Sequence, residues 1–148
     1  RFTAPDNKRE MQDVSFNDDL INIKFGFDKK GQPNMVAFNR LSTRYLKNEI
    51  DSYYIISIDG KTNKVTFFDL YQQLPYTNYN VGTGQVMLKE KQFFNIFNQQ
   101  KDYSLSKLTI INTLRAMKVQ SHNEHVTLKE QQLKKSLELF DTTLRQYS

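Results

Sequence analysis

The spacing of apolar residues changes once along this chain, from the two-residue period of a strand to the three- and four-residue spacing of a helix. Ile21, Ile23 and Phe25 alternate with polar or small residues, which is typical of a half-buried strand. From about residue 88 onward, apolar residues recur every three or four positions instead, as they do on one face of a helix. This order predicts an α+β fold, with antiparallel strands first and helices last.

Two antiparallel β-hairpins are predicted in the N-terminal part, over about 20–38 and 53–68. Turn-forming residues at 28–33 interrupt the first hairpin. Asp59 and Gly60 interrupt the second, between two runs of β-branched and aromatic residues. Asp-Gly in that setting favours a tight hairpin turn. These strands would form the sheet of the N-terminal part.

The segments around the hairpins carry weaker patterns. Residues 1–19 have no sustained period and are expected to form an arm or loop. A short helix is expected over 41–48, and Asp69 is expected to cap a short helical turn that ends near Pro75. Residues 76–84, which include two glycines, are predicted to be a loop.

A three-helix segment is predicted over about 88–147. The first helix covers about 88–100, the second begins at a Ser104 cap, and the third begins at Thr127, where Glu130 completes a capping box. A buried stripe on the second helix is predicted at residues that recur every three positions: Leu105, Leu108, Ile111, Leu114 and Met117. A four–three repeat marks one face of the third helix: Leu133, Leu137, Phe140, Leu144 and Tyr147.

Length and composition limit the organisation of the chain. Its 148 residues suffice for one core, so we expect a single domain, mainly strand over 20–85 and mainly helical over 86–148. The absence of cysteine excludes disulfides, thiolate catalysis and cysteine-ligated metals. No apolar run approaches the roughly 20 residues of a membrane span, so no span is expected within this segment.

The motifs that resemble metal or phosphate sites favour structural interpretations. Residues 122–125, His-Asn-Glu-His, do not match the His-Glu-x-x-His pattern of zinc enzymes. They are expected to form a polar loop between helices, and no metal is predicted. Residues 82–84, Gly-Thr-Gly, lack the Gly-Lys-Ser/Thr ending of a phosphate-binding loop. No cofactor and no catalytic residue is therefore assigned.

The net charge of +5 is concentrated in the helical part. Residues 86–148 hold 10 Lys/Arg and 6 Asp/Glu, whereas residues 1–85 hold 11 and 10. A basic helix can lie against a nucleic-acid backbone, although interleaved acidic residues favour a solvated face. The predicted anion or nucleic-acid contacts are Lys107, Arg115, Lys118, Lys129, Lys134 and Lys135.

A protein partner or a second copy of the chain is the other candidate ligand. Tyrosine gives a large contact area at low entropic cost, and the repeat on the last helix suits either packing within the domain or a partner. The predicted partner surface consists of Tyr71, Tyr76, Tyr79, Leu133, Leu137, Phe140, Leu144 and Tyr147.

These observations favour a non-enzymatic protein–protein interaction or assembly domain of a larger complex. One alternative is nucleic-acid binding through residues 86–148, and a second is a hydrolase that uses carboxylates near Asp18, Asp19 or Asp51.

The composition also indicates the kind of genome. The chain contains 60 residues of the amino acids with AT-rich codons and 17 of those with GC-rich codons, which indicates a bacterial or phage genome rich in AT. The start at Arg1 without Met is expected for a processed or excised segment, and it leaves a cytoplasmic or an extracytoplasmic location open.

Overall fold

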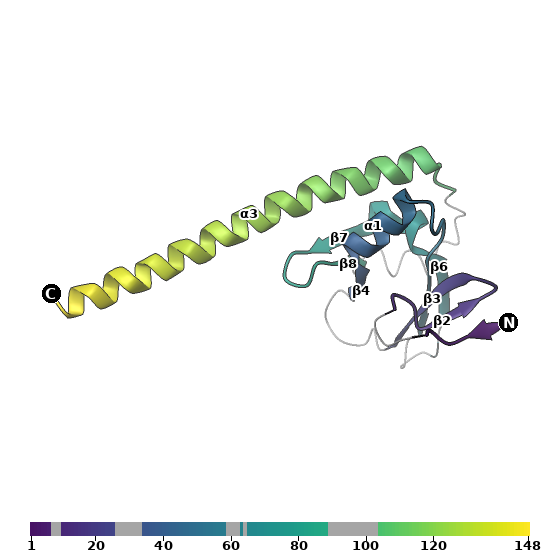
Figure 1. Cartoon of the computed structure of the whole chain (residues 1–148), viewed down its shortest axis with the longest axis horizontal. Coiled ribbons are helices and arrows are strands. Elements are labelled where there is room, and N and C mark those ends of the chain that lie inside the picture. The colour runs from purple at the N-terminus through teal and green to yellow at the C-terminus, as the bar shows by residue number, and fades with distance from the viewer. Residues whose placement is uncertain (7–9, 26–33, 59–62, 64, 89–103) are drawn as a thin grey trace. The chain divides into compact units, whose positions relative to one another are not determined.

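The computed structural model describes residues 1–6, 10–25, 34–58, 63, 65–88 and 104–148 (Figure 1). Its elements are β1 (Phe2–Thr3), β2 (Val14–Phe16), β3 (Asp19–Phe25), β4 (Asn34–Ala37), α1 (Phe38–Leu46), β5 (Tyr54–Ile58), β6 (Val65–Asp69), the 3₁₀ helix η1 (Leu70–Tyr76), β7 (Thr77–Asn80), β8 (Gln85–Leu88) and α3 (Lys107–Gln146). Strands fill the N-terminal part and a long helix the C-terminal part, so the predicted α+β class is confirmed. Residues 1–19, expected as an arm or loop, contribute two short strands.

The strands form two sheets. One has five strands in the order β1-β2-β3-β5-β6, and the other has three in the order β4-β8-β7. β5 and β6 pair antiparallel from Tyr54 opposite Asp69 to Ile58 opposite Val65. The predicted hairpin over 53–68 is therefore confirmed, and its turn, except for Asn63, lies outside the described residues.

The predicted hairpin over 20–38 is wrong. β3 pairs antiparallel with β2 and parallel with β5, whereas β4 pairs with β8 in the other sheet. Leu20, Ile21 and Asn22 are buried in succession, as expected of a strand in the middle of a sheet, which needs a neighbour on each side. The apolar pattern located both strands but could not identify their partners.

Helix α1 confirms the short helix expected over 41–48. Its inner face buries Phe38, Leu41 and Tyr45. The helix ends where Asn48 adopts a left-handed backbone with φ of 56°, a conformation that asparagine tolerates and that often follows a helix. This places Asn48 and the residues after it beside the last turn of α1.

Asp69 joins β6 to η1, as expected. Its Oδ1 accepts hydrogen bonds from the backbone N–H of Tyr53 at 3.0 Å and of Tyr71 at 3.1 Å. After η1, residues 77–80 form β7, so the loop predicted over 76–84 is wrong in its first half. The turn to β8 uses Gly84 at a φ of 69°, a conformation that glycine adopts without steric penalty.

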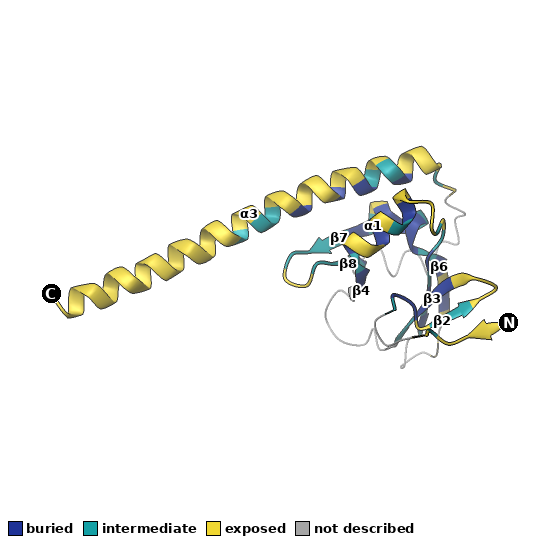
Figure 2. Cartoon of the chain, viewed as in Figure 1, coloured by how far each residue is buried: buried dark blue, intermediate teal, exposed yellow. Residues whose placement is uncertain are grey.

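The core of the N-terminal part consists of large side chains that are almost fully buried. It contains Met35, Phe38, Leu41, Tyr53, Ile55, Leu70, Tyr71, Leu74, Val86 and Leu88, together with Ile110 and Leu114 from the first turns of α3. Two of its polar side chains are linked by hydrogen bonds: the Asn22 amide donates to the Tyr53 hydroxyl at 2.9 Å, and that hydroxyl donates to the Met11 carbonyl at 2.6 Å. Figure 2 shows that the C-terminal half of α3 is, by contrast, exposed.

α3 is a continuous helix of 40 residues, about 60 Å long at 1.5 Å per residue. It begins at Lys107 and is capped by Ser106, whose Oγ accepts a hydrogen bond from the Thr109 N–H at 3.2 Å, two residues after the predicted cap at Ser104. The two last predicted helices are joined in α3, and the one expected over about 88–100 lies almost wholly outside the described residues.

The loop predicted at residues 122–125 is wrong, because these residues lie within α3. Neither glycine nor proline occurs between 107 and 146, so nothing there terminates a helix strongly. The predicted buried stripe is correct in part: Leu114 and Met117 are buried, whereas Leu108 is 69% exposed and Ile110, outside the predicted stripe, is buried. A strict three-residue repeat turns about 60° around a helix with each step and cannot stay on one face.

The chain divides into two compact units, Arg1–Leu114 and Arg115–Ser148. The expectation of one domain over 1–148 stays a prediction. In agreement with the sequence, none of the described helices is long and apolar enough to cross a membrane.

Candidate functional site

The second unit presents an apolar seam along one side of α3. Because α3 is continuous, the four–three repeat extends toward the N-terminus in one heptad register. We define the α3 seam as the a and d positions of that register: Ala116, Val119, Asn123, Val126, Glu130, Leu133, Leu137, Phe140, Leu144 and Tyr147. All ten side chains are exposed, although eight of them are apolar or aromatic. Such a pattern is typical of helices that pack against another helix.

The α3 seam begins next to the boundary between the two units. Thr109 and Asn112 occupy the preceding a and d positions and are polar, and the first apolar position is Ala116. The exposed fraction of the larger seam side chains rises from 51% at Leu137 to 87% at Tyr147. The seam therefore belongs to the part of α3 whose apolar side chains contact water.

Sequence reasoning found half of this seam. Leu133, Leu137, Phe140, Leu144 and Tyr147 were predicted; the first four share one face of α3, which ends one residue before Tyr147. Val119 and Val126 were missed, because residues 122–125 were expected to be a loop. The absence of glycine and proline from the whole segment was the signal that could have joined the two halves.

The three tyrosines of the predicted partner surface lie in different environments. Tyr71 is fully buried, and its hydroxyl donates to the Leu41 carbonyl at 2.6 Å. It is therefore a core residue, and burial, followed by the charge of Asp69, raises the pKa of its hydroxyl. Tyr79 is half-buried in β7, with its ring edge-on to that of Phe38 at 5.8 Å between centroids. Tyr76, also half-buried, ends η1.

A second apolar surface covers one face of the five-stranded sheet. The Phe2 and Phe16 rings lie 4.9 Å apart, and the Tyr54 and Phe67 rings stack at the same separation. Phe2 and Phe67 remain 66% and 59% exposed. These aromatic pairs cover one another in part, so this face is less continuous than the α3 seam.

The predicted basic contacts do not all share one face. At about 100° per residue, Arg115, Lys118 and Lys129 fall within roughly 60° of one another, whereas Lys134 and Lys135 point to other sides of α3. Between 107 and 129 the single carboxylate is Glu124, about 120° or more around the helix from that group. The side of α3 that carries Arg115, Lys118 and Lys129, which we call the basic sector, therefore has no carboxylate between residues 107 and 129, but it holds few basic residues.

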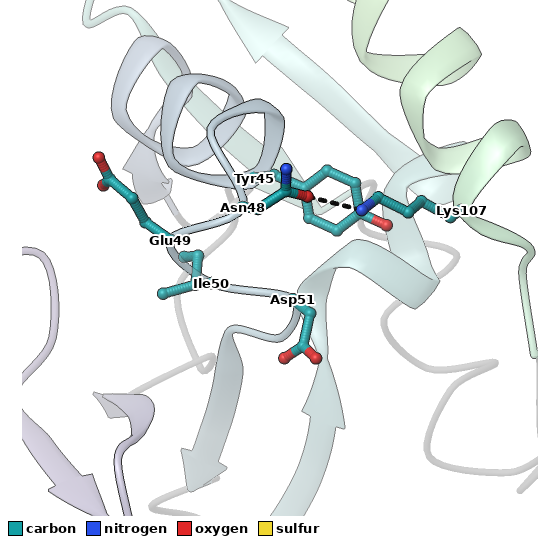
Figure 3. A pocket seen from close by; sticks show the side chains of 6 residues that line it. All are labelled: Tyr45, Asn48, Glu49, Ile50, Asp51 and Lys107. Carbon is teal, nitrogen blue, oxygen red and sulfur yellow. Dashed lines mark hydrogen bonds between the residues drawn. The ribbon is translucent and has the colours of Figure 1, made fainter.

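Lys107, the first residue of α3, lines a pocket in the first unit (Figure 3). The pocket measures about 490 Å³ and is also lined by Tyr45, Asn48, Glu49, Ile50 and Asp51. The Lys107 ammonium donates to the Asn48 Oδ1 at 2.6 Å and lies 6.0 Å from the centroid of the Tyr45 ring. This contact holds the start of α3 against the end of α1.

The charged groups of this pocket do not converge on one point. Figure 3 shows the Glu49 and Asp51 carboxylates directed away from each other and from Lys107. Glu49 accepts from the Arg44 guanidinium at 3.3 Å in an exposed ion pair. Burial, and then the charges of Asp69 and Asp51, raise the pKa of the Tyr45 hydroxyl, which keeps it protonated. The pocket can hold a small polar molecule but presents no nucleophile–base pair.

Of the carboxylates of the hydrolase alternative, Asp19 and Asp51 both lie near enough to Asp69 for their charges to add to burial in raising its pKa. Asp18 is in the turn before β3 at a φ of 71°, and Asp19 accepts from the Ser52 hydroxyl at 3.5 Å. Of Asp18, Asp19 and Asp51, only Asp51 lines the pocket. Within the described ranges no group of three metal-ligating side chains occurs.

Strand pairing brings together a row of three polar side chains that the sequence did not indicate. Lys24, Ser57 and Thr66 lie opposite one another on β3, β5 and β6. Burial lowers the pKa of Lys24, partly opposed by Asp13. The Ser57 and Thr66 hydroxyls are buried and have no hydrogen-bond partner in the part of the chain that the structure describes. A Ser–Lys pair can act as nucleophile and base, but Ser57 is not hydrogen-bonded to Lys24 here.

No protein-family model matches this chain, and no curated protein matches its sequence. A function must therefore come from the side chains and their geometry. The α3 seam combines exposure, apolar character and a regular repeat over residues 116–147, and none of the other surfaces described above combines all three.

Proposed function

We propose that the chain is an assembly domain in which α3 binds α3 of a second copy through the α3 seam. The observation that supports this is the persistence of one heptad register from Ala116 to Tyr147 on an exposed helix. A seam of this length spans more than four heptads, whereas three or four suffice to indicate a coiled coil. A helix that only covered its own domain would turn these residues inward.

The free energy gained by burying the seam is similar in size to the cost of association. Fully burying a leucine or phenylalanine contributes about 1.5–3 kcal/mol, and two copies bring eight such side chains from Leu133, Leu137, Phe140 and Leu144. Even half of their sum, roughly 6–12 kcal/mol, is comparable with the loss of translational and rotational freedom, about 4–15 kcal/mol. Burial of the smaller apolar seam residues also stabilises the dimer, whereas burial of the polar Asn123 and Glu130 side chains destabilises it. We therefore expect a reversible dimer whose population depends on concentration.

The size of the surface also fits a second copy. The seam and its flanking e and g positions comprise 18 residues of each helix between 116 and 147, close to the roughly 20–30 residues that each side of a stable interface contributes. Over 115–148 the helix carries six Lys/Arg and four Asp/Glu, so two copies repel each other only weakly.

Light scattering after size exclusion, over a dilution series of the full chain, tests this proposal. We expect a species of twice the 17.5 kDa monomer mass that dissociates on dilution. Leu137→Asp, in the seam, should give monomer at every concentration, because the new carboxylate would be buried in the interface. Leu139→Asp is the matched control, since Leu139 is 69% exposed and lies outside the seam.

Two results would contradict the proposal. One is a wild-type chain that stays monomeric at the highest concentration, and the other is a Leu137→Asp chain that associates as well as the wild type. Near-ultraviolet circular dichroism of the buried tyrosines in the first unit checks that each variant is folded.

A second candidate function, nucleic-acid binding, is favoured by the acid-free sector that contains Arg115 and Lys129. A titration of duplex DNA at several salt concentrations tests it. Phosphate contacts would make affinity fall steeply between about 50 and 200 mM salt. Arg115→Gln with Lys129→Gln should reduce that slope, and binding that ignores both salt and these changes would contradict this function.

A further inference from the structure

We infer that the two α3 helices of the dimer run antiparallel, an inference that rests on the proposed self-association. The side chains of the α3 seam increase in size along the helix. The first half contains Ala116, Val119 and Val126, and the second half contains leucines, Phe140 and Tyr147. A helix with this gradient fits a copy of itself best when the small end of one meets the large end of the other.

Antiparallel pairing produces five kinds of layer, each present twice, that combine a small or polar residue with a larger apolar one. In an antiparallel pair of helices, an a position of one faces a d position of the other, and the two-fold axis repeats every contact. The layers are Ala116 with Tyr147, Val119 with Leu144, Asn123 with Phe140, Val126 with Leu137, and Glu130 with Leu133, each facing its counterpart on the second copy. The summed volume therefore changes little from layer to layer, and the helices can stay at one separation.

Parallel pairing would set like against like. Ala116 would face Ala116 at one end and Tyr147 would face Tyr147 at the other, so the separation of the helices would have to change along their length. At position 130, the Glu130 carboxylates of the two copies would share one layer of the seam, whereas antiparallel pairing places them in the two neighbouring layers on either side of the two-fold axis. Like charges at close range in a partly buried interface repel strongly.

The e and g positions that flank the α3 seam give an independent reason for antiparallel pairing. In a parallel pair, a g position faces the e position five residues later in the partner, which sets Lys129 against Lys134 on both sides. In an antiparallel pair e faces e and g faces g. Thr127 then lies near Lys134, and Lys129 near Ser136, so no like-charged pair remains among these flanking residues.

This arrangement fixes the geometry of the assembly. Each seam covers 32 residues, about 48 Å of helix. Leu114, the last residue of the first unit, lies near the start of α3, so antiparallel pairing puts the two copies of this residue near opposite ends of the paired helices.

Cysteine cross-linking of the full chain tests the orientation, because the chain has no cysteine of its own. Val126→Cys and Leu137→Cys are prepared as single variants and oxidised in glutathione buffer, each alone and as an equal mixture. A disulfide needs Cα atoms about 4.4–6.8 Å apart, which antiparallel pairing provides only between position 126 of one copy and position 137 of the other. We expect covalent dimer mainly in the mixture, with peptides containing positions 126 and 137 linked in mass spectra.

The outcomes separate the orientation from self-association. Efficient cross-linking of Val126→Cys with itself would overturn the antiparallel orientation while leaving self-association intact. Dimers by light scattering that cross-link in neither the single variants nor the mixture would overturn the layer assignment. A chain that is monomeric by light scattering would overturn the proposed function, and the orientation with it. Leu139→Cys, outside the seam, is the control for random oxidation.

Discussion

The buried carboxylate of Asp69 gives the fold a defined dependence on pH. Burial raises the pKa of Asp69 from 3.8 to about 6, and the charges of Asp51 and Asp19 add to this, although two backbone N–H groups hydrogen-bond to the carboxylate and act in the opposite direction. The folded state therefore retains the proton that the unfolded state loses between about pH 4 and 6. Over that window the free energy of unfolding should fall as pH rises, because the unfolded state binds fewer protons.

The size of the change in the free energy of unfolding follows from the size of the pKa shift of Asp69. Each pKa unit corresponds to about 1.4 kcal/mol, so ionisation of Asp69 should lower the free energy of unfolding by up to about 3 kcal/mol above pH 7. Asp69→Asn keeps an oxygen that can accept from Tyr53 and Tyr71 but cannot ionise. We expect this variant to be close to wild type near pH 4 and more stable than wild type near pH 8.

Urea denaturation of both proteins at several pH values, followed by near-ultraviolet circular dichroism, measures the difference. Taking the difference between variant and wild type cancels the titration of all other groups. The reasoning is refuted if that difference stays constant from pH 4 to 8, or if Asp69→Asn loses stability as pH rises. Asp69→Ala, which removes both hydrogen bonds, should be less stable than Asp69→Asn at every pH, by about 1–3 kcal/mol.

Two further predictions concern the first unit and use the same denaturation assay. Tyr71→Phe should lower the free energy of unfolding by about 1–3 kcal/mol, because it leaves the Leu41 carbonyl without its buried donor; an unchanged midpoint would mean that water replaces the hydroxyl. Gly84→Ala should destabilise by about 1 kcal/mol, since Gly84 has a φ of 69°, whereas Gly82→Ala, at a glycine without positive φ, should change less; equal effects would contradict the assignment of strain to Gly84.

Local signals predicted the elements better than their partners. β5 and β6 were recognisable because alternating apolar residues flank an Asp-Gly turn, and the short helix was recognisable from Leu41 and Tyr45 one turn apart. The partner strands of β3 could not be recognised from the sequence. A hairpin is the usual arrangement for strands that follow one another, and the parallel contact with β5 involves residues far along the chain. The row of Lys24, Ser57 and Thr66 was hidden for the same reason.

The candidate surface was half predicted. The apolar repeat after Leu133 was visible, but its continuation to Val119 required that residues 122–125 be helical. The polar character of residues 122–125 predicts a loop, but polar residues are equally expected on an exposed helix. The Thr127 capping-box pattern added to this error, because the same residue types are tolerated inside a helix whose backbone is already hydrogen-bonded.

The parallel contact between β3 and β5 has a consequence for how the chain folds. Ile21 lies beside Tyr54, so this contact closes a loop of more than thirty residues that includes β4 and α1. The β5–β6 hairpin and α1 involve short sequence separations and should form early, whereas closing the longer loop should limit the rate. Until β3 docks, one edge of β5 remains open, and the chain is then most exposed to aggregation through that edge.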